Sequence, residues 1–366
     1  MPVSANLTRT FDGELTMGTD LWNRDTFTDA LTGHSPLLKM LEAFGSIKTL
    51  TGGIGNPFVV EPLCFETGTG PTPQGISDEF AELPVVPLQG YSSSLWQLAE
   101  KAAILAIGIR EFKQLGSKTA KLDLFQRKFE IFRKRFIKII YKEMFAAENA
   151  AGAVGSATTV ASLRTLLNRG NNGSAAAIDE YIDATQIGTA IGTGAPTLVG
   201  NIDRAVADNA FWSTPCEAPG SPAAAAASVL MSQITLASRN GDTPKLGLMR
   251  PAAWNKYPPI LMGIGQTNIW EKSDALKKFD TFRYRGVEFA FDPLMPYNVA
   301  GTTTTSQMLV INPEYIAILA ASKWPDFMQL PQDKTMTKQW QMSWFLQLIG
   351  RHLGNVHARH SNLDAS

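Results

Sequence analysis

The clearest pattern of apolar and polar positions in this chain lies between residues 122 and 144. Large apolar side chains recur there every three or four residues, which is the spacing of one face of an α-helix. The pattern predicts a single amphipathic helix of about 25 residues, roughly 37 Å long. Its apolar stripe consists of Leu122, Phe125, Phe129, Phe132, Phe136, Ile139 or Ile140, and Met144.

Shorter helices are predicted on both sides of this one. A helix over residues 36–44 has Ser35 as its N-cap, Pro36 at its first position and Gly45 as its stop signal. Because isolated helices of this length are marginal in water, it must pack on the rest of the chain. Further helices are expected over 160–168, 177–186 and 222–240, and another begins at 251–257.

Apolar runs bounded by Pro, Gly and Asn predict strands. Runs 58–65 and 83–88 would form a long hairpin, 95–109 would lead back to the body, and 340–348 alternates as a half-buried strand does. Because helices and hairpins mix without regular alternation, the expected fold class is α+β. The remaining strands expected are 246–250, a hairpin around Gly286, and a pair formed by 308–311 and 315–319 around Asn312 and Pro313.

Charge is distributed unevenly between two neighbouring segments. Residues 49–99 contain no lysine or arginine, whereas cations outnumber acids over 110–143. A long acidic loop is hard to bury in its own domain, and a basic helix offers a complementary surface, on this chain or on another copy of it. The acids are Glu61, Glu66, Asp78, Glu79 and Glu82, and the central cations of the helix are Arg127, Lys128, Arg133, Lys134, Arg135 and Lys138.

The composition limits the class of protein. A length of 366 residues suits roughly two or three compact units, and 44% hydrophobic residues favour a folded chain over a disordered one. A charged fraction of 18% is low and suits a surface covered by partners. The net charge of zero gives no reason to expect bulk nucleic-acid binding through neutralised phosphates.

Cellular location is constrained by absent signals. Cys64 and Cys216, the two cysteines, are far apart, which fits a reducing compartment better than a disulfide framework. No signal peptide precedes the first helix, and no apolar run approaches the length of a membrane helix. We therefore expect a soluble protein without membrane contact, assembled in the cytoplasm.

Motifs that carry catalysis are absent from the sequence. No Gly-Lys dipeptide could form a phosphate-binding loop, and the glycines of 188–194 lack the spacing of a dinucleotide fingerprint. His352, His357 and His360 are interpreted as polar residues of an edge strand, since a zinc site needs closer ligands and more of them. Cys64 has no neighbouring histidine. We therefore assign no catalytic, cofactor-binding or metal-binding residues and expect no enzymatic activity.

Several short motifs occur in a characteristic order, and together they resemble the major capsid proteins of tailed bacteriophages, which have the Hong Kong 97-type fold. The resemblance covers nearly the whole chain. Its motifs are Ser35-Pro36-Leu37-Leu38 with Gly52-Gly53, Trp96 through Leu115-Gly116-Ser117-Lys118, Gly200-Asn201-Ile202-Asp203-Arg204 with Phe211-Trp212, Phe282-Arg283-Tyr284-Arg285-Gly286-Val287 with Asp292-Pro293, and Asn312 with Tyr315.

The resemblance implies an architecture. Residues 1–50 would be an N-terminal arm and 51–95 an extended loop that lies over a neighbouring subunit. Residues 96–215 and 321–366 would form a peripheral domain with the long spine helix, and 216–320 an axial domain. The chain would assemble into hexamers and pentamers of an icosahedral head, located in the virion and assembled in the host cytoplasm.

The resemblance also implies partners: other copies of the chain, a portal, a separate scaffolding or decoration protein, and double-stranded DNA held on the inner face without sequence specificity. No scaffolding domain is expected within the arm, which is smaller than an ordinary domain. The hypothesis for contacts between subunits adds apolar residues of the loop to the charged ones. It comprises Phe58, Glu61, Leu63, Phe65, Glu66, Asp78, Glu79, Glu82, Arg127, Lys128, Arg133, Lys134, Arg135 and Lys138.

Two alternatives remain open at this stage. One is an encapsulin-like nanocompartment shell with the same fold, and the other is an intracellular α+β enzyme with a site built from scattered residues. The type member of the capsid family cross-links its subunits through a lysine of the extended loop. Between Lys48 and Lys101 this chain has no lysine, so we expect its subunits to be held together without such bonds.

Overall fold

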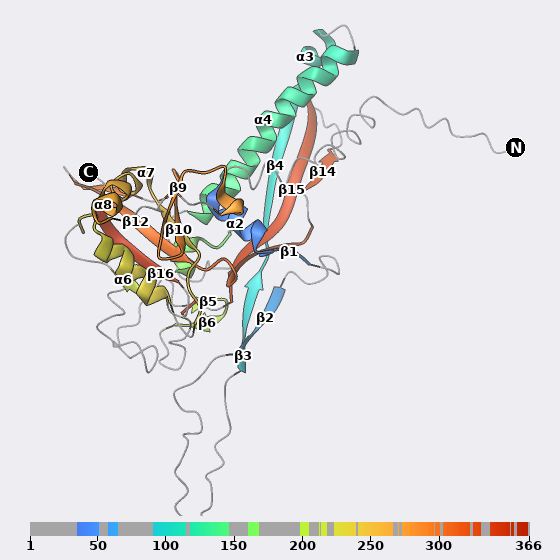
Figure 1. The fold of residues 1–366 in the computed structure, drawn as a ribbon. Coiled ribbons are helices and arrows are strands. Elements are labelled where there is room, and N and C mark those ends of the chain that lie inside the picture. The colour runs from blue at the N-terminus through green and yellow to red at the C-terminus, as the bar shows by residue number, and fades with distance from the viewer. Residues whose placement is uncertain are drawn as a thin grey trace, which may run out of the picture.

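The computed structural model describes residues 35–50, 58–64, 91–114, 118–145, 160–167, 198–204, 212, 214–217, 223–238, 241–265, 270, 273–295, 297–300, 303–322, 325–330, 337–351, 353–354 and 357–364. Figure 1 shows two β-sheets side by side, a long helix along the first of them, and a two-stranded hairpin that extends from the body. The architecture is α+β, as the sequence predicts.

The first sheet is built around one long strand, β15 (Thr337–Gly350). The strand β4 (Ala99–Gly108) pairs antiparallel with its first part, over ten residues. On the other side of β15, β14 (Asp326–Gln329) and β13 (Ile316–Ala320) pair with successive parts of it, and β1 (Ile47–Thr49) runs parallel to β13. Every strand of this sheet except β1 therefore depends directly on β15.

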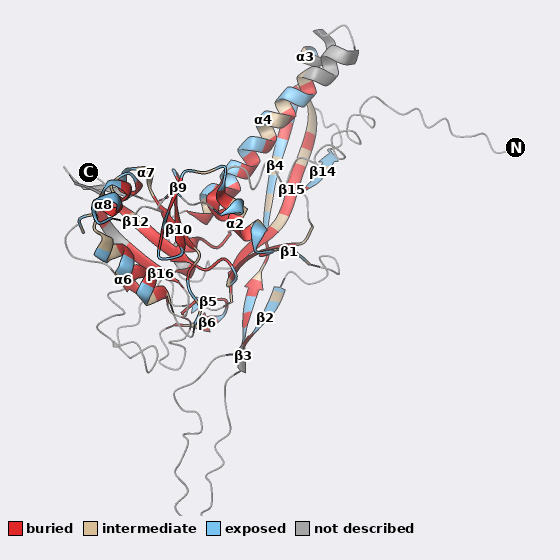
Figure 2. Cartoon of the chain, viewed as in Figure 1, coloured by how far each residue is buried: buried red, intermediate tan, exposed pale blue. Residues whose placement is uncertain are grey.

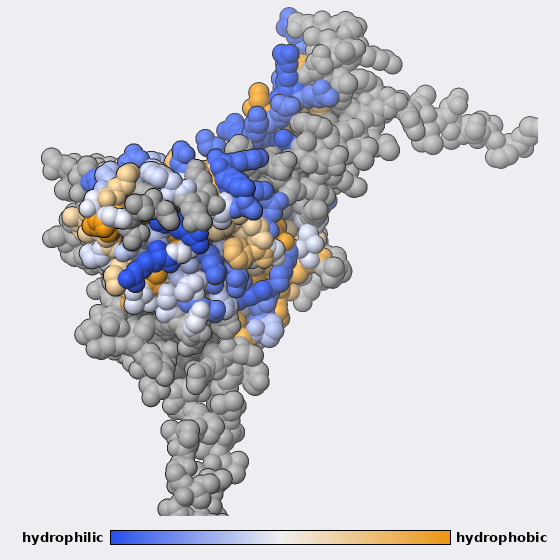
Figure 3. All heavy atoms as spheres, viewed as in Figure 1, coloured by the Kyte–Doolittle hydropathy of each residue, from blue (hydrophilic) through white to orange (hydrophobic). Residues whose placement is uncertain are grey.

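The helix α4 (Lys118–Met144) covers one face of this sheet, and its 27 residues match the predicted length. Phe125 and Phe129 are fully buried, and Phe136, Ile140 and Met144 are buried as well. Figure 2 shows buried and exposed segments alternating along α4, and Figure 3 shows hydrophilic residues along the helix on the face in view. The apolar stripe read from the sequence is thus the packing face of α4.

Aromatic contacts join α4 to the sheet. The ring of Phe125 meets Trp340 of β15 edge-on, with the centroids 4.8 Å apart. Phe129 meets Phe327 of β14 in the same way at 4.9 Å. Edge-to-face pairs of this kind add to the free energy gained from burial alone. The aromatic residues that the sequence places in the helix stripe and in 340–348 therefore form one core.

The strand β15 is more deeply buried than a half-buried strand. Trp340, Met342 and Trp344 alternate toward α4 as predicted, but Ser343 is also buried and Gln347 has no exposed surface. The side chain of Gln347 is satisfied by the backbone, because its Oε1 accepts from the nitrogens of Ala161 (2.8 Å) and Leu348 (3.2 Å).

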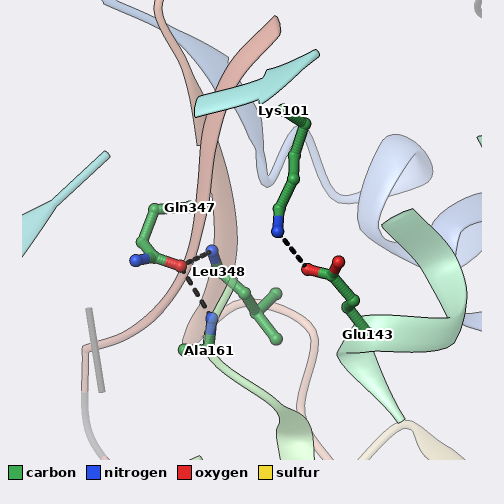
Figure 4. A network of polar contacts seen from close by, with 5 residues as sticks. All are labelled: Lys101, Glu143, Ala161, Gln347 and Leu348. Carbon is green, nitrogen blue, oxygen red and sulfur yellow. Dashed lines mark hydrogen bonds and ion pairs between the residues drawn. The ribbon is translucent and has the colours of Figure 1, made fainter. Parts of the chain in front are cut away.

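Figure 4 shows these bonds beside the ion pair of Lys101 with Glu143, which ties β4 to α4 at 2.7 Å. The Nε2 of Gln347 also donates to the carbonyl of Gln97, at 2.7 Å. On the second face of β15, Gln347 thus binds the backbone at Ala161 and Gln97, which the alternating pattern alone did not indicate.

The second sheet has the order β7-β16-β12-β8-β10-β9, with β11 also paired to β12. Its strands are β7 (Cys216–Glu217), β8 (Leu246–Met249), β9 (Thr281–Tyr284), β10 (Val287–Phe291), β11 (Tyr297–Ala300), β12 (Thr303–Ile311) and β16 (Ala358–Asp364). The helices α6 (Ala227–Ala237), α7 (Pro251–Trp254) and α8 (Tyr257–Gly263) pack near it. The hairpin predicted around Gly286 is β9–β10.

Three smaller elements complete the described structure. The helix α2 (Pro36–Ala43) has the predicted cap at Ser35 and stop at Gly45, and it contacts β8, β13 and the 3₁₀ turn η2 (Asp274–Leu276). The helices α3 (Ile109–Gln114) and α5 (Leu163–Leu166) are short, as is the hairpin of β5 (Leu198–Val199) and β6 (Ile202–Asp203). The helices expected over 160–168 and 222–240 are present but shorter than predicted.

The strand pair predicted around Asn312 and Pro313 is wrong. Both strands exist, but β12 lies in the second sheet and β13 in the first, so the chain crosses from one sheet to the other at this point. The crossing is held by hydrogen bonds from distant residues. The Oγ of Ser46 donates to the carbonyl of Pro313 (2.7 Å), and the nitrogen of Asn312 donates to Nδ1 of His357 (3.2 Å).

The exposed edge position predicted for the histidines is also wrong where the structure tests it. His357 and His360 are buried, and β16, which carries His360, lies between β7 and β12. Residues 358–364 therefore belong to the second sheet, although the predicted division gives them to the peripheral domain. The side chain of His352 and the predicted elements 83–88 and 177–186 lie outside the described residues. The predicted domain boundaries stay predictions.

Candidate inter-subunit surfaces

The hairpin that extends from the body is formed by β2 (Phe58–Cys64) and β3 (Tyr91–Gln97). The partner of β2 is thus 91–97 and not the 83–88 run expected from the sequence. Residues directly opposite each other in an antiparallel pair share one face. Val59 therefore shares a face with Trp96, and Val60 shares the other face with Leu95.

One face of this hairpin packs on the body. Leu63 and Trp96 are buried within the chain, and Glu61 forms an ion pair with Arg351 at 3.3 Å. Trp96 lies against Gly200, where an added Cβ would come within 2.9 Å of the indole. Gly200 has a φ of 58°, a conformation that glycine adopts without strain.

The motif that contains Gly200 therefore has a local role. The turn at Gly200 and Asn201 joins β5 to β6, and the carbonyl of Gly200 accepts from the nitrogen of Leu95 at 2.8 Å. Trp212, at the end of the same motif, donates from Nε1 to the carbonyl of Val199 at 2.9 Å. The residues that carry the sequence resemblance here form the support of the hairpin.

The other face of the hairpin is apolar and open. The exposed fractions are 44% for Phe58, 58% for Val60 and 37% for Leu95. A two-stranded hairpin is marginally stable alone, and exposed adjacent apolar side chains are typical of surfaces that another molecule covers. Of the apolar residues predicted to contact a neighbour, Phe58 lies on this open face, whereas Leu63 lies on the buried one.

The basic residues of α4 divide in a similar way. Arg127, Lys134, Arg135 and Lys138 are exposed on the helix surface, together with the apolar Ile131 and Ile139. Cations and isoleucines thus lie next to one another on the outer side of the helix, where the predicted contact with a neighbour could form.

Two other basic residues of the predicted set have partners within the chain. Lys128 forms an ion pair with Glu111 of α3 at 2.6 Å. Arg133 is buried, and this burial lowers the pKa of its guanidinium, although the charge of Glu130 opposes the shift. The predicted residues Phe65, Glu66, Asp78, Glu79 and Glu82 lie outside the described residues, so the contact between this loop and a neighbour stays a prediction.

A buried hydrogen-bond chain joins three segments that are far apart in the sequence, and sequence reasoning missed it. The Oγ of Ser35, the N-cap of α2, donates to the hydroxyl of Tyr141 in the last turn of α4, and that hydroxyl donates to Oδ2 of Asp292 after β10. Oδ1 of Asp292 accepts from the nitrogen of Leu294 at 2.9 Å. The helices α2 and α4 and the second sheet thus meet at one point.

The buried position of this hydrogen-bond chain shifts the pKa values of Asp292 and Tyr141. Burial raises the pKa of Asp292, although hydrogen bonds from Tyr141, Leu294 and Ser35 oppose part of the rise. Burial also raises the pKa of Tyr141, and the neighbouring charge of Asp292 raises it further. Tyr141 therefore keeps its proton and remains a donor. The signal in the sequence was the Asp292-Pro293 motif, but its partners cannot be read from local spacing.

Within the described ranges, no group of three or more His, Cys, Asp or Glu side chains is placed to hold a metal ion. No helix in the described part of the chain is long and apolar enough to span a membrane. Cys216 is buried, and the side chain of Cys64 is not described.

Comparisons with known proteins give a likeness in structure. No family model and no curated protein matches the sequence. The capsid of cyanophage A-1(L) contains a chain with a TM-score of 0.62 and 13% identity, which covers 90% of this chain and 92% of that one. The capsid of a native GTA particle matches with a TM-score of 0.50 and 10% identity, over 89% and 90% of the two chains.

A weaker likeness is found to the holo-encapsulin complex of Synechococcus elongatus, with a TM-score of 0.49 and 9% identity over 89% and 88% of the two chains. The first two likenesses extend over about nine tenths of each chain. The chain therefore has the Hong Kong 97-type capsid fold that the sequence motifs indicate.

Proposed function

We propose that this chain is the major capsid protein of a tailed bacteriophage. Its copies assemble into hexamers and pentamers, and these form the icosahedral shell that encloses the genome. The observation that carries this proposal is the likeness to the cyanophage A-1(L) capsid chain, which extends over nearly the full length of both chains. A fold alone hosts many functions, so the surfaces of this chain must support the proposal as well.

The open face of the hairpin supports it. Phe58, Val60 and Leu95 are exposed on a two-stranded element that extends away from the body. A neighbouring subunit could cover this face and remove apolar area from water, which stabilises an assembly by about 25 cal/mol per Å². Stable specific contacts need roughly 1,200 Å² of total buried area per pair, and an extended hairpin can supply a large part of it.

The proposed role is structural and needs no catalysis or cofactor. The partners would be other copies of the chain, a portal, a separate scaffolding or decoration protein, and double-stranded DNA held without sequence specificity. Assembly would take place in the host cytoplasm. Contacts between the acidic loop and a basic surface of the neighbour would steer association more than they add affinity.

Sedimentation and negative-stain electron microscopy of the purified, recombinant chain test the proposal. We expect closed icosahedral particles in the megadalton range, and infected cells should yield particles that contain DNA. Boiled, reduced particles should give one band near the sequence mass of 39.8 kDa, because the loop lacks the lysine of the cross-linking reaction. A chain that stays monomeric with every candidate partner protein co-expressed would contradict the proposal, and particles filled with a cargo enzyme would indicate an encapsulin-like shell.

A further inference from the structure

A pocket of about 300 Å³ lies between α2, η2 and the β9–β10 hairpin. Its apolar lining includes Met40 of α2, Phe44 directly after α2, and Ala275 of η2. Met40 is buried, but Phe44 is 39% exposed although it is a large aromatic residue. The volume is at the lower end of the range for ligand pockets and is large enough for one aromatic side chain.

The polar lining of the pocket has a net positive charge. Among the described residues of the lining, Lys245 and Arg283 contribute two cations and Glu288 contributes one carboxylate. Glu288 is buried and already accepts hydrogen bonds from the Ser273 nitrogen (3.2 Å) and from Oγ1 of Thr281 (3.0 Å). The complementary group is therefore an apolar side chain flanked by carboxylates.

A segment of this same sequence has that chemistry. Residues 78–82 read Asp78-Glu79-Phe80-Ala81-Glu82, so an aromatic ring stands between acids in a stretch without any cation. We propose that the pocket binds residues 78–82 of a second copy of this chain, with Phe80 against the apolar lining and the acids facing Lys245 and Arg283. This inference rests on the proposed function, because it requires neighbouring copies in a shell.

The length of the chain permits this contact. The described hairpin ends at Cys64 and Tyr91, and Phe80 is 11 residues from Tyr91 along the sequence. A chain of that length reaches at most about 36–40 Å. In Figure 1 the described end of the β2–β3 hairpin points away from α2, β9 and β10, which border the pocket. A neighbouring copy is the better supported source.

The exposed cations of α4 are the competing partner for the same acids. The pocket offers both an apolar cavity for Phe80 and two cations for the neighbouring acids. Charge-reversal variants distinguish the pocket from α4 as the partner of these acids. Arg283→Glu tests the pocket, and Arg135→Glu, an exposed position of α4, is the matched control. Glu79→Arg supplies the reversed charge on the incoming segment.

Particle yield at low salt is measured by sedimentation for each full-length variant. We expect Arg283→Glu and Glu79→Arg each to reduce the yield about tenfold, and their combination to restore most of it, because complementary charges determine correct pairing. Arg135→Glu should leave the yield within about twofold of the starting protein. A loss with Arg135→Glu that Glu79→Arg restores, without any rescue of Arg283→Glu, would overturn the proposal in favour of α4.

A second measurement, disulfide formation between introduced cysteines, requires no charge reversal. In the variant Arg283→Cys with Glu79→Cys, oxidised particles should give covalent multimers on a non-reducing denaturing gel, and neither single variant should. Disulfide-linked monomers without multimers would place the segment in its own subunit, and no new bond would show that it does not reach the pocket. Both results overturn the proposal while particles still form, whereas a starting protein that forms no particles contradicts the proposed function itself.

Discussion

The sheet built on β15 and the hairpin β2–β3 are both antiparallel, but they differ in what surrounds them. The sheet has α4 on one face, and its polar side chains, such as Gln347, are satisfied by the backbone of the same chain. The hairpin has one face on the body and an open face that carries Phe58 and Val60. The first region is thus mostly buried within one subunit, with Ile104 and Met328 exposed on its second face, whereas the hairpin is covered on one face only.

This difference separates two consequences of mutation. A substitution in the sheet should lower the free energy of unfolding of one subunit, whether or not the shell forms. A substitution on the open face of the hairpin should leave the subunit stable and impair assembly. Residues between the two sheets, such as Tyr141 and Asp292, should affect the stability of the subunit by an intermediate amount.

The largest effect is expected for Trp340→Ala. The side chain is fully buried and meets Phe125 of α4, so its removal leaves a cavity in the core of the first sheet. The cost should be about 3–5 kcal/mol in the free energy of unfolding, measured by denaturant titration of unassembled protein. A loss below 1 kcal/mol would mean that the region does not depend on this contact.

A smaller effect is expected for Tyr141→Phe. The substitution keeps the ring but removes the hydroxyl that links Ser35 to Asp292, and a buried carboxyl group loses a donor. The cost should be about 1–3 kcal/mol, typical of a buried polar group left without its partner. Tyr315→Phe is a useful control, because that hydroxyl also donates to a carboxylate, Asp242, but in a more exposed place. Equal losses for the two variants would argue against a special role of the junction.

The pH dependence of stability tests the same junction. Burial raises the pKa of Asp292, so the folded chain holds this proton more tightly than the unfolded chain does. The contribution of Asp292 to stability therefore falls as the pH rises from the usual carboxyl pKa through the raised one. In Asp292→Asn, whose amide oxygen can still accept from Tyr141, that fall should be absent. Unfolding curves at several pH values check this, and parallel profiles of variant and starting protein would contradict it.

The smallest effect on the subunit is expected for Phe58→Ser combined with Val60→Ser. Both side chains are exposed, so the free energy of unfolding should change by no more than about 0.5 kcal/mol. Particle yield should nevertheless fall, because the apolar face that a neighbour would cover is lost. Leu63→Ser on the buried face of the same strand is the control, and it should destabilise the subunit itself. Normal particles from the double variant would remove the hairpin face from the interface.

The comparison also shows which features could be predicted from the sequence. The helix α4 and the strand β15 carry repeating patterns of apolar side chains, and the repeat itself reports the packing face. The cap of α2 and the turn at Gly286 depend on one or two residues and could be predicted equally well. All these features are local, so their signals lie within a few residues of one another.

The features that could not be predicted depend on contacts between residues that are distant in the sequence. The Asn312–Pro313 segment has the signal of a hairpin turn, but β12 pairs with β8 and β16, and β13 pairs with β15 and β1 in the other sheet. His357 is buried because its Nδ1 accepts from the nitrogen of Asn312, 45 positions away. The contact of Ser35, Tyr141 and Asp292 likewise joins segments that no local pattern connects.

The crossing at Asn312 and Pro313 has a mechanical consequence. Ile311 ends β12 and Ile316 begins β13, so a link of four residues joins the two sheets, and the Cα atoms of Ile311 and Ile316 can lie at most about 18 Å apart. Such a link has little slack, and the hydrogen bonds of Ser46 and His357 hold it further. A force on one sheet would therefore act on the other after very little extension of the link. Under outward pressure on a closed shell, each subunit would carry tension as one piece rather than open between its sheets.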